Sequence, residues 1–170
     1  MRTIKANDWS EVPENYTGVV NFPNRVECYK DGIRHRDGSP AVEYSDGHKE
    51  WWFDGKLHRT DGPAVEFSGG QKEWWFEGNL HREDGPAVEY ADGDKQWYKE
   101  GKRHREDGPA VEYSGGTKFW YLEDQDYEQI NLKDYVILGY DKGEYGIMWY
   151  RLLDKDRIFE CPDIPGLIKK

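Results

Sequence analysis

The chain has few cysteines and no long apolar run, and both features limit what it can be. Its two cysteines, Cys28 and Cys161, lie far apart in the sequence and form no disulfide framework. No stretch is apolar enough for a signal peptide or a membrane span. We therefore expect a cytoplasmic protein with no membrane span.

Basic residues are also few relative to acidic ones. The 170 residues include 24 Lys and Arg against 34 Asp and Glu, which gives a formal net charge of −10. Because no basic patch is visible, we expect no direct binding of nucleic acid through its phosphates. Two interpretations of the acidic charge stay open: it serves docking on basic surfaces, or it only keeps an edge-rich sheet soluble.

What the chain does contain is aromatic residues and a repeat. Phe, Trp and Tyr make up 15% of the residues, a content that disordered acidic chains lack. The stretch 54–76, DGKLHRTDGPAVEFSGGQKEWWF, recurs four times with few changes between Asp31 and Tyr121. Such self-similarity at a fixed period indicates a repeat array. A histidine, a proline and a tryptophan follow the 23-residue period: His35, His58, His81 and His104; Pro40, Pro63, Pro86 and Pro109; Trp51, Trp74, Trp97 and Trp120.

Each repeat predicts two strands and two turns. The segments 41–44 and 49–53 are rich in strand-forming residues, and the Asp46-Gly47 pair between them predicts a two-residue hairpin turn. A second turn is expected at the pair 54–55, and Pro40 suits a strand start because no ladder donor is lost there. The predicted fold is all-β: about five 23-residue β-hairpin repeats in a twisted single sheet.

A two-residue turn at residues 46–47 fixes the pairing of the two strands. It places Val42 opposite Trp51, on a face suited to packing, and Glu43 opposite Glu50 on the other face. Two facing carboxylates are destabilising unless they are compensated. The His-Arg pair of the same or the neighbouring repeat is available for this, so we expect a ladder of Glu, Arg, His and aromatic side chains.

The two ends of the chain depart from the repeat. Residues 1–17 are expected to form an N-terminal cap, residues 18–123 the array, and residues 124–170 a C-terminal β cap or tail. Residues 124–134 predict a short helix or an irregular link. Terminal units with their own sequence are expected because an open array must be sealed at its ends.

The first copy of the repeat, residues 18–32, is degenerate. Its turn at Pro23-Asn24 is one residue short of the others. Cys28 falls at the position of the repeat tryptophan, where we expect it to pack as a small hydrophobic residue.

The string HR-DGPAVEY-(S/A)-x-G-x-K-x-W resembles the MORN family, and within it a variant found in proteins of bacteriophages and of some bacteria. The opening from Trp9 to Gly18 is typical of the same variant. The resemblance covers residues 8–123 and implies β-hairpin units and a non-catalytic scaffold that binds proteins or lipid headgroups. Residues after 123 depart from the pattern, so nothing is carried over to them.

Candidate binding residues form two columns in the array and one cluster in the tail. The arginine column would bind anions and, with the second aromatic column, would sandwich a base; the alternative is pairing of the arginines with a glutamate column. Tyr145 and Trp149 belong to an aromatic cluster of the kind that anchors interfaces, or else they pack inside the cap. The two candidate columns are Arg36, Arg59, Arg82 and Arg105, and the second aromatic column Trp52, Trp75, Tyr98 and Tyr121; the glutamate column of the alternative is Glu43, Glu66, Glu89 and Glu112.

Neither catalysis nor a metal or other cofactor is predicted. Carboxylate pairs recur in every early repeat, whereas a catalytic site is normally made once. Equivalent histidines of adjacent repeats lie about 10 Å apart, two strand spacings, while zinc needs its ligands about 2 Å from one ion. We expect the histidines to be structural and to pack, with the arginines, on the preceding tryptophans.

The leading hypothesis is a non-catalytic repeat protein that binds a protein partner. The resemblance adds a setting: a phage-encoded inhibitor of a bacterial defence component, with a basic host defence protein as partner in the host cytoplasm. Two alternatives stay open, namely a sponge that holds a nucleotide-like signal between the Trp and Arg columns, and an enzyme housed in the tail. Exposed sheet edges are compatible with a homodimer.

Overall fold

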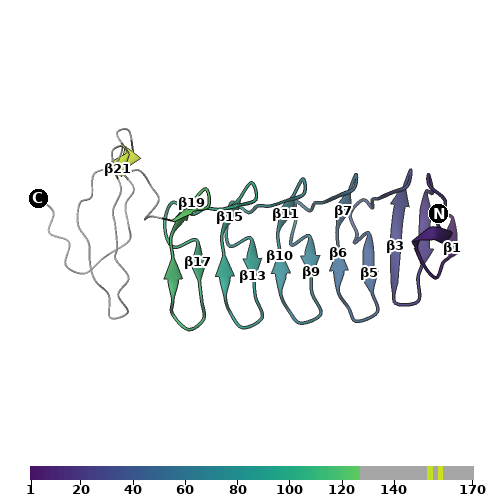
Figure 1. Cartoon of the computed structure of the whole chain (residues 1–170), viewed down its shortest axis with the longest axis horizontal. Coiled ribbons are helices and arrows are strands. Elements are labelled where there is room, and N and C mark those ends of the chain that lie inside the picture. The colour runs from purple at the N-terminus through teal and green to yellow at the C-terminus, as the bar shows by residue number, and fades with distance from the viewer. Residues whose placement is uncertain (127–152, 155–156, 159–170) are drawn as a thin grey trace, which may run out of the picture.

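The computed structural model describes residues 1–126, 153–154 and 157–158. These residues form a long row of β-hairpins, which Figure 1 shows from β1 near the N-terminus to β19. One 3-10 turn, η1 (Trp9–Glu11), interrupts the strands near the start. The predicted all-β fold of successive hairpin repeats is confirmed.

The lower hairpins in Figure 1 belong to one twelve-stranded sheet that runs the length of the array. The second strand of each lower hairpin also pairs with the first strand of the next, as Glu50 does with Val65. The sheet is therefore continuous from repeat to repeat. The lower hairpins are β5 (Val42–Tyr44) with β6 (Lys49–Glu50), β9 (Val65–Glu66) with β10 (Lys72–Glu73), β13 (Val88–Glu89) with β14 (Lys95–Gln96), and β17 (Val111–Glu112) with β18 (Lys118–Phe119).

Each repeat adds a short upper hairpin above the lower one (Figure 1). Neighbouring upper hairpins are linked by backbone hydrogen bonds: the Gly78 N–H donates to the Leu57 carbonyl at 2.9 Å, and the Arg59 N–H to the Trp75 carbonyl at 3.1 Å. The upper hairpins are β7 (Trp52–Phe53) with β8 (Lys56–Leu57), β11 (Trp75–Phe76) with β12 (Asn79–Leu80), β15 (Tyr98–Lys99) with β16 (Lys102–Arg103), and β19 (Tyr121–Leu122) with β20 (Gln125–Asp126).

The turns of the lower hairpins differ from the prediction. The Tyr44 N–H donates to the His48 carbonyl at 2.9 Å, and the Gly47 N–H donates to the Tyr44 carbonyl at 3.0 Å. The loop therefore contains three residues, Ser45 to Gly47, and Gly47 takes a φ of 93°. This is the common three-residue loop, a type I turn followed by a left-handed glycine. The two-residue turn predicted at residues 46–47 is wrong.

The extra loop residue shifts the pairing of the strands by one. Glu43 lies opposite Lys49 and Val42 opposite Glu50, so the predicted pairs Glu43–Glu50 and Val42–Trp51 are wrong. Opposite charges now face each other across the sheet, which is favourable. The pairing continues from strand to strand as one charged row: Glu43, Lys49, Glu66, Lys72, Glu89, Lys95, Glu112 and Lys118.

The second turn of each repeat is the tight two-residue turn. Asp54 has a φ of 45° and Gly55 a φ of 76°, which is the type I′ pattern. The same geometry recurs at Glu123 and Asp124, with φ values of 55° and 65°. Residues 124–126 thus lie in a turn and in β20, where a helix or irregular link was expected; residues 127–134 lie outside the described residues.

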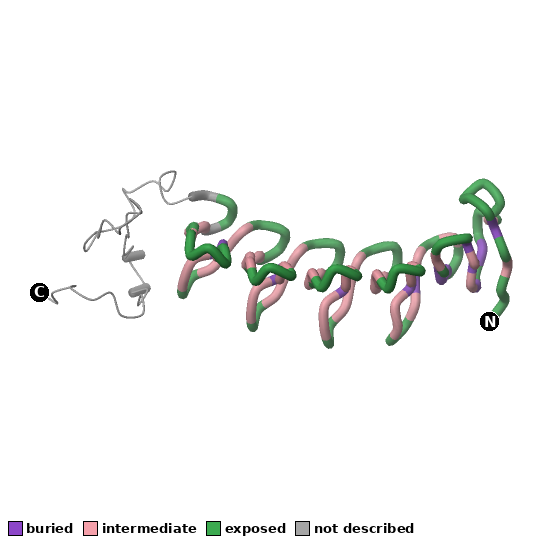
Figure 2. Tube along the Cα trace, turned by 90° about the horizontal axis from the view of Figure 1, so that it is seen from below, coloured by how far each residue is buried: buried purple, intermediate pink, exposed green. Residues whose placement is uncertain are grey.

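The buried core of the array is thin. Figure 2 shows buried positions as isolated points along a chain that is mostly exposed or half-buried. An Ala-Val pair in each repeat supplies these points. The valine is the first residue of the first lower strand, and the alanine comes directly before it. All eight side chains are at most 4% exposed: Ala41, Val42, Ala64, Val65, Ala87, Val88, Ala110 and Val111.

The N-terminal end has a larger core. Strand β1 (Thr3–Lys5) pairs in parallel with β2 (Gly18–Asn21) and lies at the edge of the sheet. Strand β2 pairs with β3 (Arg25–Lys30), which also pairs with β4 (Ile33–Arg34). The segment before β2 and the β2–β3 hairpin together form this core. Its buried residues are Ala6, Tyr16, Val20, Phe22 and Tyr29, with Ile4 and Val12 packed against them.

Two predictions about the first repeat are confirmed. The Phe22 N–H donates to the Arg25 carbonyl at 2.9 Å, so Pro23 and Asn24 form a two-residue loop, one residue shorter than the lower loops of the later repeats. Cys28 is 2% exposed and packs as a small hydrophobic residue. The short strands β21 (Leu153–Asp154) and β22 (Arg157–Ile158) pair with each other; the rest of the expected C-terminal cap lies outside the described residues.

Candidate binding surface

In three of the four repeats, the second aromatic residue is hydrogen-bonded to the side chain two residues before it. The Trp52 Nε1–H donates to the Glu50 carboxylate at 2.7 Å, and the Trp75 Nε1–H donates to the Glu73 carboxylate at 2.9 Å. The Tyr98 hydroxyl donates to the Gln96 side chain at 2.9 Å. All four rings of this column, including Tyr121, are half-buried, so only part of each ring faces solvent.

Three residues of the arginine column stack on the first aromatic column, which is the column of repeat tryptophans Trp51, Trp74, Trp97 and Trp120. The guanidinium carbon of Arg59 lies 4.1 Å from the centre of the Trp51 ring, and Arg82 lies 4.0 Å from that of Trp74. Arg105 lies 4.0 Å from the centre of the Trp97 ring. Arginine over tryptophan is the strongest common cation–π pair. The structure thus brings three of the four predicted arginines together with Trp51, Trp74 and Trp97, and not with the second aromatic column. The fourth, Arg36, lies beside Cys28, which takes the place of the tryptophan in the first repeat.

The same arginines are also bound to oxygen atoms. The Arg59 Nε–H donates to Asp61 at 2.7 Å, and its Nη1 donates to the Pro63 carbonyl and to Glu66. Beside this guanidinium, the pKa of the Asp61 carboxyl is lowered, mainly by the hydrogen bond. Pairing with the glutamate column occurs in four repeats, at 3.0 to 3.2 Å: Arg36 with Glu43, Arg59 with Glu66, Arg82 with Glu89, and Arg105 with Glu112.

Two further arginines contact the second aromatic column. Arg34 lies 5.1 Å from the Trp52 ring centre, and Arg103 lies 3.9 Å from that of Tyr121. Sequence reasoning missed both. The sequence did contain a signal for both residues. This position of the repeat is Arg34, Leu57, Leu80 and Arg103 in the four repeats, and a change from leucine to arginine at the two ends of the array indicates a different environment there.

Glu27 is the centre of a buried polar cluster in the first repeat. Its carboxylate accepts hydrogen bonds from the Tyr29 hydroxyl, from Arg25, and from the Arg34 Nε–H at 2.8 Å. Burial opposes ionisation of Glu27, but these three hydrogen bonds outweigh it and lower its pKa. Burial and the hydrogen bond to the carboxylate raise the pKa of Tyr29. The cluster therefore holds a carboxylate and a neutral phenol, which fix the N-terminal core.

Three histidines and two phenylalanines form a row of rings along the upper edge of the array, which is the edge formed by the upper turns. The Phe53 ring lies 4.6 Å from His35 and 5.8 Å from His58, and the Phe76 ring lies 4.7 Å from His58 and 6.1 Å from His81. The Nδ1 of His58 accepts the Glu77 N–H of the next turn at 3.2 Å. His35, His58 and His81 therefore position the upper turns, which gives these three histidines a structural role by a different contact from the predicted packing on tryptophan.

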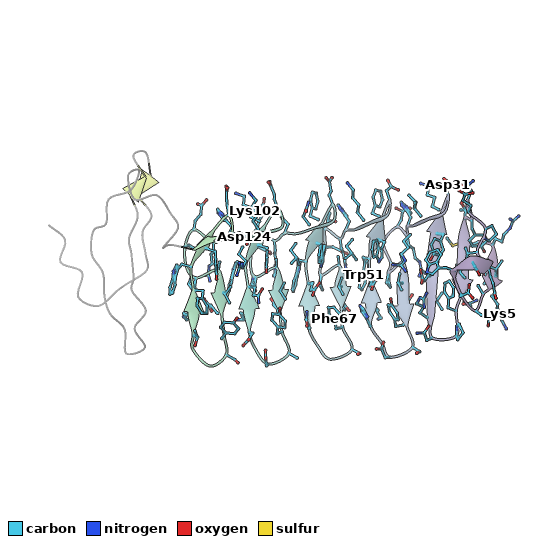
Figure 3. All side chains as sticks on the ribbon, viewed as in Figure 1. Lys5, Asp31, Trp51, Phe67, Lys102 and Asp124 are labelled. Carbon is cyan, nitrogen blue, oxygen red and sulfur yellow. The ribbon has the colours of Figure 1, made fainter. Side chains whose placement is uncertain are left out.

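The upper edge also carries exposed apolar and acidic side chains. Phe53 and Phe76 are each 44% exposed although they are large hydrophobic residues. The first residue of every upper turn is acidic and has a positive φ. Figure 3 shows this edge between the labelled Asp31 and Lys102. The five acidic turn residues are Asp31, Asp54, Glu77, Glu100 and Glu123.

Tyr145 and Trp149, the predicted binding residues of the tail, lie outside the described residues. In the described part of the chain, no helix is long and apolar enough to cross a membrane. A scan against protein-family models finds no match, and no curated protein matches the chain.

Proposed function

We propose that this chain is a non-catalytic repeat protein that binds a protein partner through its upper edge. The observation that supports the proposal is the row of rings formed by His35, Phe53, His58, Phe76 and His81, in which Phe53 and Phe76 stay 44% exposed. Rigid aromatic side chains that already stand exposed lose little freedom on binding, and they are frequent anchors of protein interfaces.

The repetition of the edge favours a partner that makes several equivalent contacts. Each upper hairpin is hydrogen-bonded to its neighbour, as Gly101 is to Leu80, so neighbouring contact points keep a fixed spacing. Contacts that are fixed relative to one another add up without a further loss of freedom. An array of modest individual contacts would then hold a partner firmly.

We further propose that the partner is a basic host protein and that the chain is a phage-encoded inhibitor of a bacterial defence component in the host cytoplasm. The net charge of −10 would attract a basic partner over distance and speed association. The setting rests on the resemblance of the repeats to phage proteins.

Affinity capture from a bacterial host lysate tests the binding function. The tagged chain is compared with the double variant Phe53→Ser/Phe76→Ser and with Tyr113→Ser, a control whose ring is 42% exposed in the last lower hairpin. We expect the chain and the control to retain one protein in stoichiometric amount and the double variant to lose it. Retention by the double variant would contradict a role of the upper edge, and retention by none would contradict the function.

Plating of phage on defence-carrying bacteria tests the inhibitor role. Expression of the chain is expected to restore plaque formation on a strain whose defence system includes the captured protein, and the double variant is expected not to restore it. Unchanged plating with the chain present would reject the inhibitor role.

A further inference from the structure

An open hollow of about 280 Å³ lies at the upper edge, between the turns that begin at Asp54 and Glu77. It is lined by Phe53, Asp54, Lys56, His58 and Glu77. Asp54 and Glu77 open consecutive upper turns, so their carboxylates come from two different hairpins, β7–β8 and β11–β12. Phe53 supplies an apolar ring beside them.

Both carboxylates of the hollow are accessible to a ligand. The Asp54 side chain is 60% exposed, and Glu77 is exposed as well. Lys56 lies over the next turn: a Cβ placed on Gly78 would be 3.7 Å from the Cβ and Cγ of Lys56. Two carboxylates against one ammonium give the hollow a formal charge of −1.

We propose that this hollow binds the cationic side chain of an arginine or lysine in an extended basic segment of the partner. An aromatic face attracts a guanidinium or ammonium group, and flanking carboxylates accept its N–H donors in charge-assisted hydrogen bonds. The inference rests on the proposed function, because it names the chemistry of the partner at the same edge.

The same set of positions recurs one repeat further along. There Phe76, Glu77, Asn79, His81 and Glu100 take the corresponding places. Asparagine replaces the lysine, so the second set carries a formal charge of −2. Glu77 belongs to both sets, which makes it the residue on which two neighbouring cation sites depend.

The spacing of the two sites defines the spacing of the ligand. Neighbouring sites are one repeat apart, which is two strands of the sheet or about 10 Å. Three residues of a chain in the polyproline II conformation span about 9 Å, and with three residues per turn every third side chain lies on the same face. A segment with a basic residue at every third position therefore places successive cations at successive sites.

Fluorescence anisotropy with synthetic peptides tests this proposal on the full chain. One labelled peptide carries three arginines, one at every third position with glycine and serine between, and a second has the same composition with the three arginines contiguous, so that no two of them are three residues apart. We expect the spaced peptide to bind about tenfold more tightly, because only it engages two sites at once. The Glu77→Gln variant is expected to weaken its binding about tenfold, since two sites lose a charge.

The control variant is Glu106→Gln, which removes the same charge from an exposed side chain outside both sets of site residues. The Glu106 carboxylate lies 3.5 Å from His104, which is also outside both sets. Its effect on peptide binding is expected to stay within about twofold, as for a screened surface charge. Thermal melts of both variants check that the array is folded.

The outcomes separate this proposal from the proposed function. Equal affinity for the two peptides, or equal weakening by Glu77→Gln and Glu106→Gln, would show general charge attraction and reject the cation sites. If the spaced peptide does not bind, while the lysate partner is captured and is lost with Phe53→Ser/Phe76→Ser, the cation sites are rejected and the protein-binding function stands. If neither the peptide nor any lysate protein binds, both are rejected.

Discussion

The Tyr29 hydroxyl donates a hydrogen bond to the Glu27 carboxylate, and both side chains are buried, at 1% and 0% exposure. The same relationship, an aromatic donor two residues after a carboxylate, links Trp52 to Glu50 in the next repeat, where the carboxylate is 14% exposed. The first repeat thus contains a buried version of a contact that the array repeats in half-exposed form.

Removal of the Glu27 charge is expected to destabilise the chain in a pH-dependent way. Glu27→Gln leaves Arg25 and Arg34 without their carboxylate, which should cost about 3 kcal/mol of the free energy of unfolding at neutral pH. Because the folded-state pKa of Glu27 is lowered, its stabilisation is complete above the unfolded pKa of about 4.3 and is lost as the pH falls through the folded value. Urea unfolding of both proteins at neutral pH and at about pH 3 measures this, and an equal difference at both would contradict it.

The loop of the last lower hairpin offers a matched pair of glycine substitutions. Nothing lies within 4 Å of a Cβ added to Gly115 or Gly116, but only Gly116 has a positive φ, at 93°. Gly115→Ala is expected to stabilise the chain by about 0.4–1 kcal/mol, because it restricts the unfolded state. Gly116→Ala is expected to destabilise it by about 1–2 kcal/mol, because alanine is strained in the left-handed region. Thermal unfolding checks the signs; a two-residue turn, with both glycines left-handed, would make both variants destabilising.

Glu77→Asn is expected to separate stability from binding. Glu77 has a φ of 49° in its turn, and asparagine tolerates this conformation better than glutamate. The variant should raise the free energy of unfolding by about 0.5 kcal/mol and should still weaken binding of the spaced peptide. Parallel melts and anisotropy measure the two effects, and a variant that binds the peptide as tightly as the original chain would remove Glu77 from the site.

Arg82→Lys tests the contacts of the arginine column. Arg82 stacks on Trp74 at 4.0 Å and donates to Asp84 at 2.8 Å and Glu89 at 3.0 Å. Lysine keeps the charge but not the planar group with several fixed donors, so a loss of about 1–2 kcal/mol is expected. The control Lys99→Arg changes an exposed cation and should alter stability by less than about 0.5 kcal/mol. Equal effects in urea unfolding would show that only the charge at Arg82 matters.

The repeat period and the upper turns could be predicted because both depend on residue types at fixed spacing. Asp54-Gly55 sits between strand residues, and its type I′ turn follows from local preference alone. The lower turn could not be assigned from the same kind of pair. Asp46-Gly47 fits a two-residue loop as well as a three-residue loop that starts at Ser45, and the choice depends on the φ of the aspartate, which its residue type does not determine.

The wrong assignment of the lower turn also explains the wrong pairing of the lower strands. A shift of one residue moves side chains to the opposite face of a strand, so Glu43 meets Lys49 and not Glu50. Pairing of arginine with the glutamate column was available as an alternative because both residue types recur in every repeat. The ring row could not be predicted, since Phe53 and His58 become neighbours of rings in other repeats only when the upper hairpins stack.

The link between upper hairpins has a consequence for how such a gene can change. The turn at Gly78 is bound to Leu57 of the preceding repeat, and Glu77 to His58, and the next turn repeats these contacts with Leu80 and His81. A duplication or deletion of one whole period by in-frame recombination would therefore recreate every junction it breaks. The number of repeats, and with it the length of the array, can therefore change during evolution while the two end units stay the same.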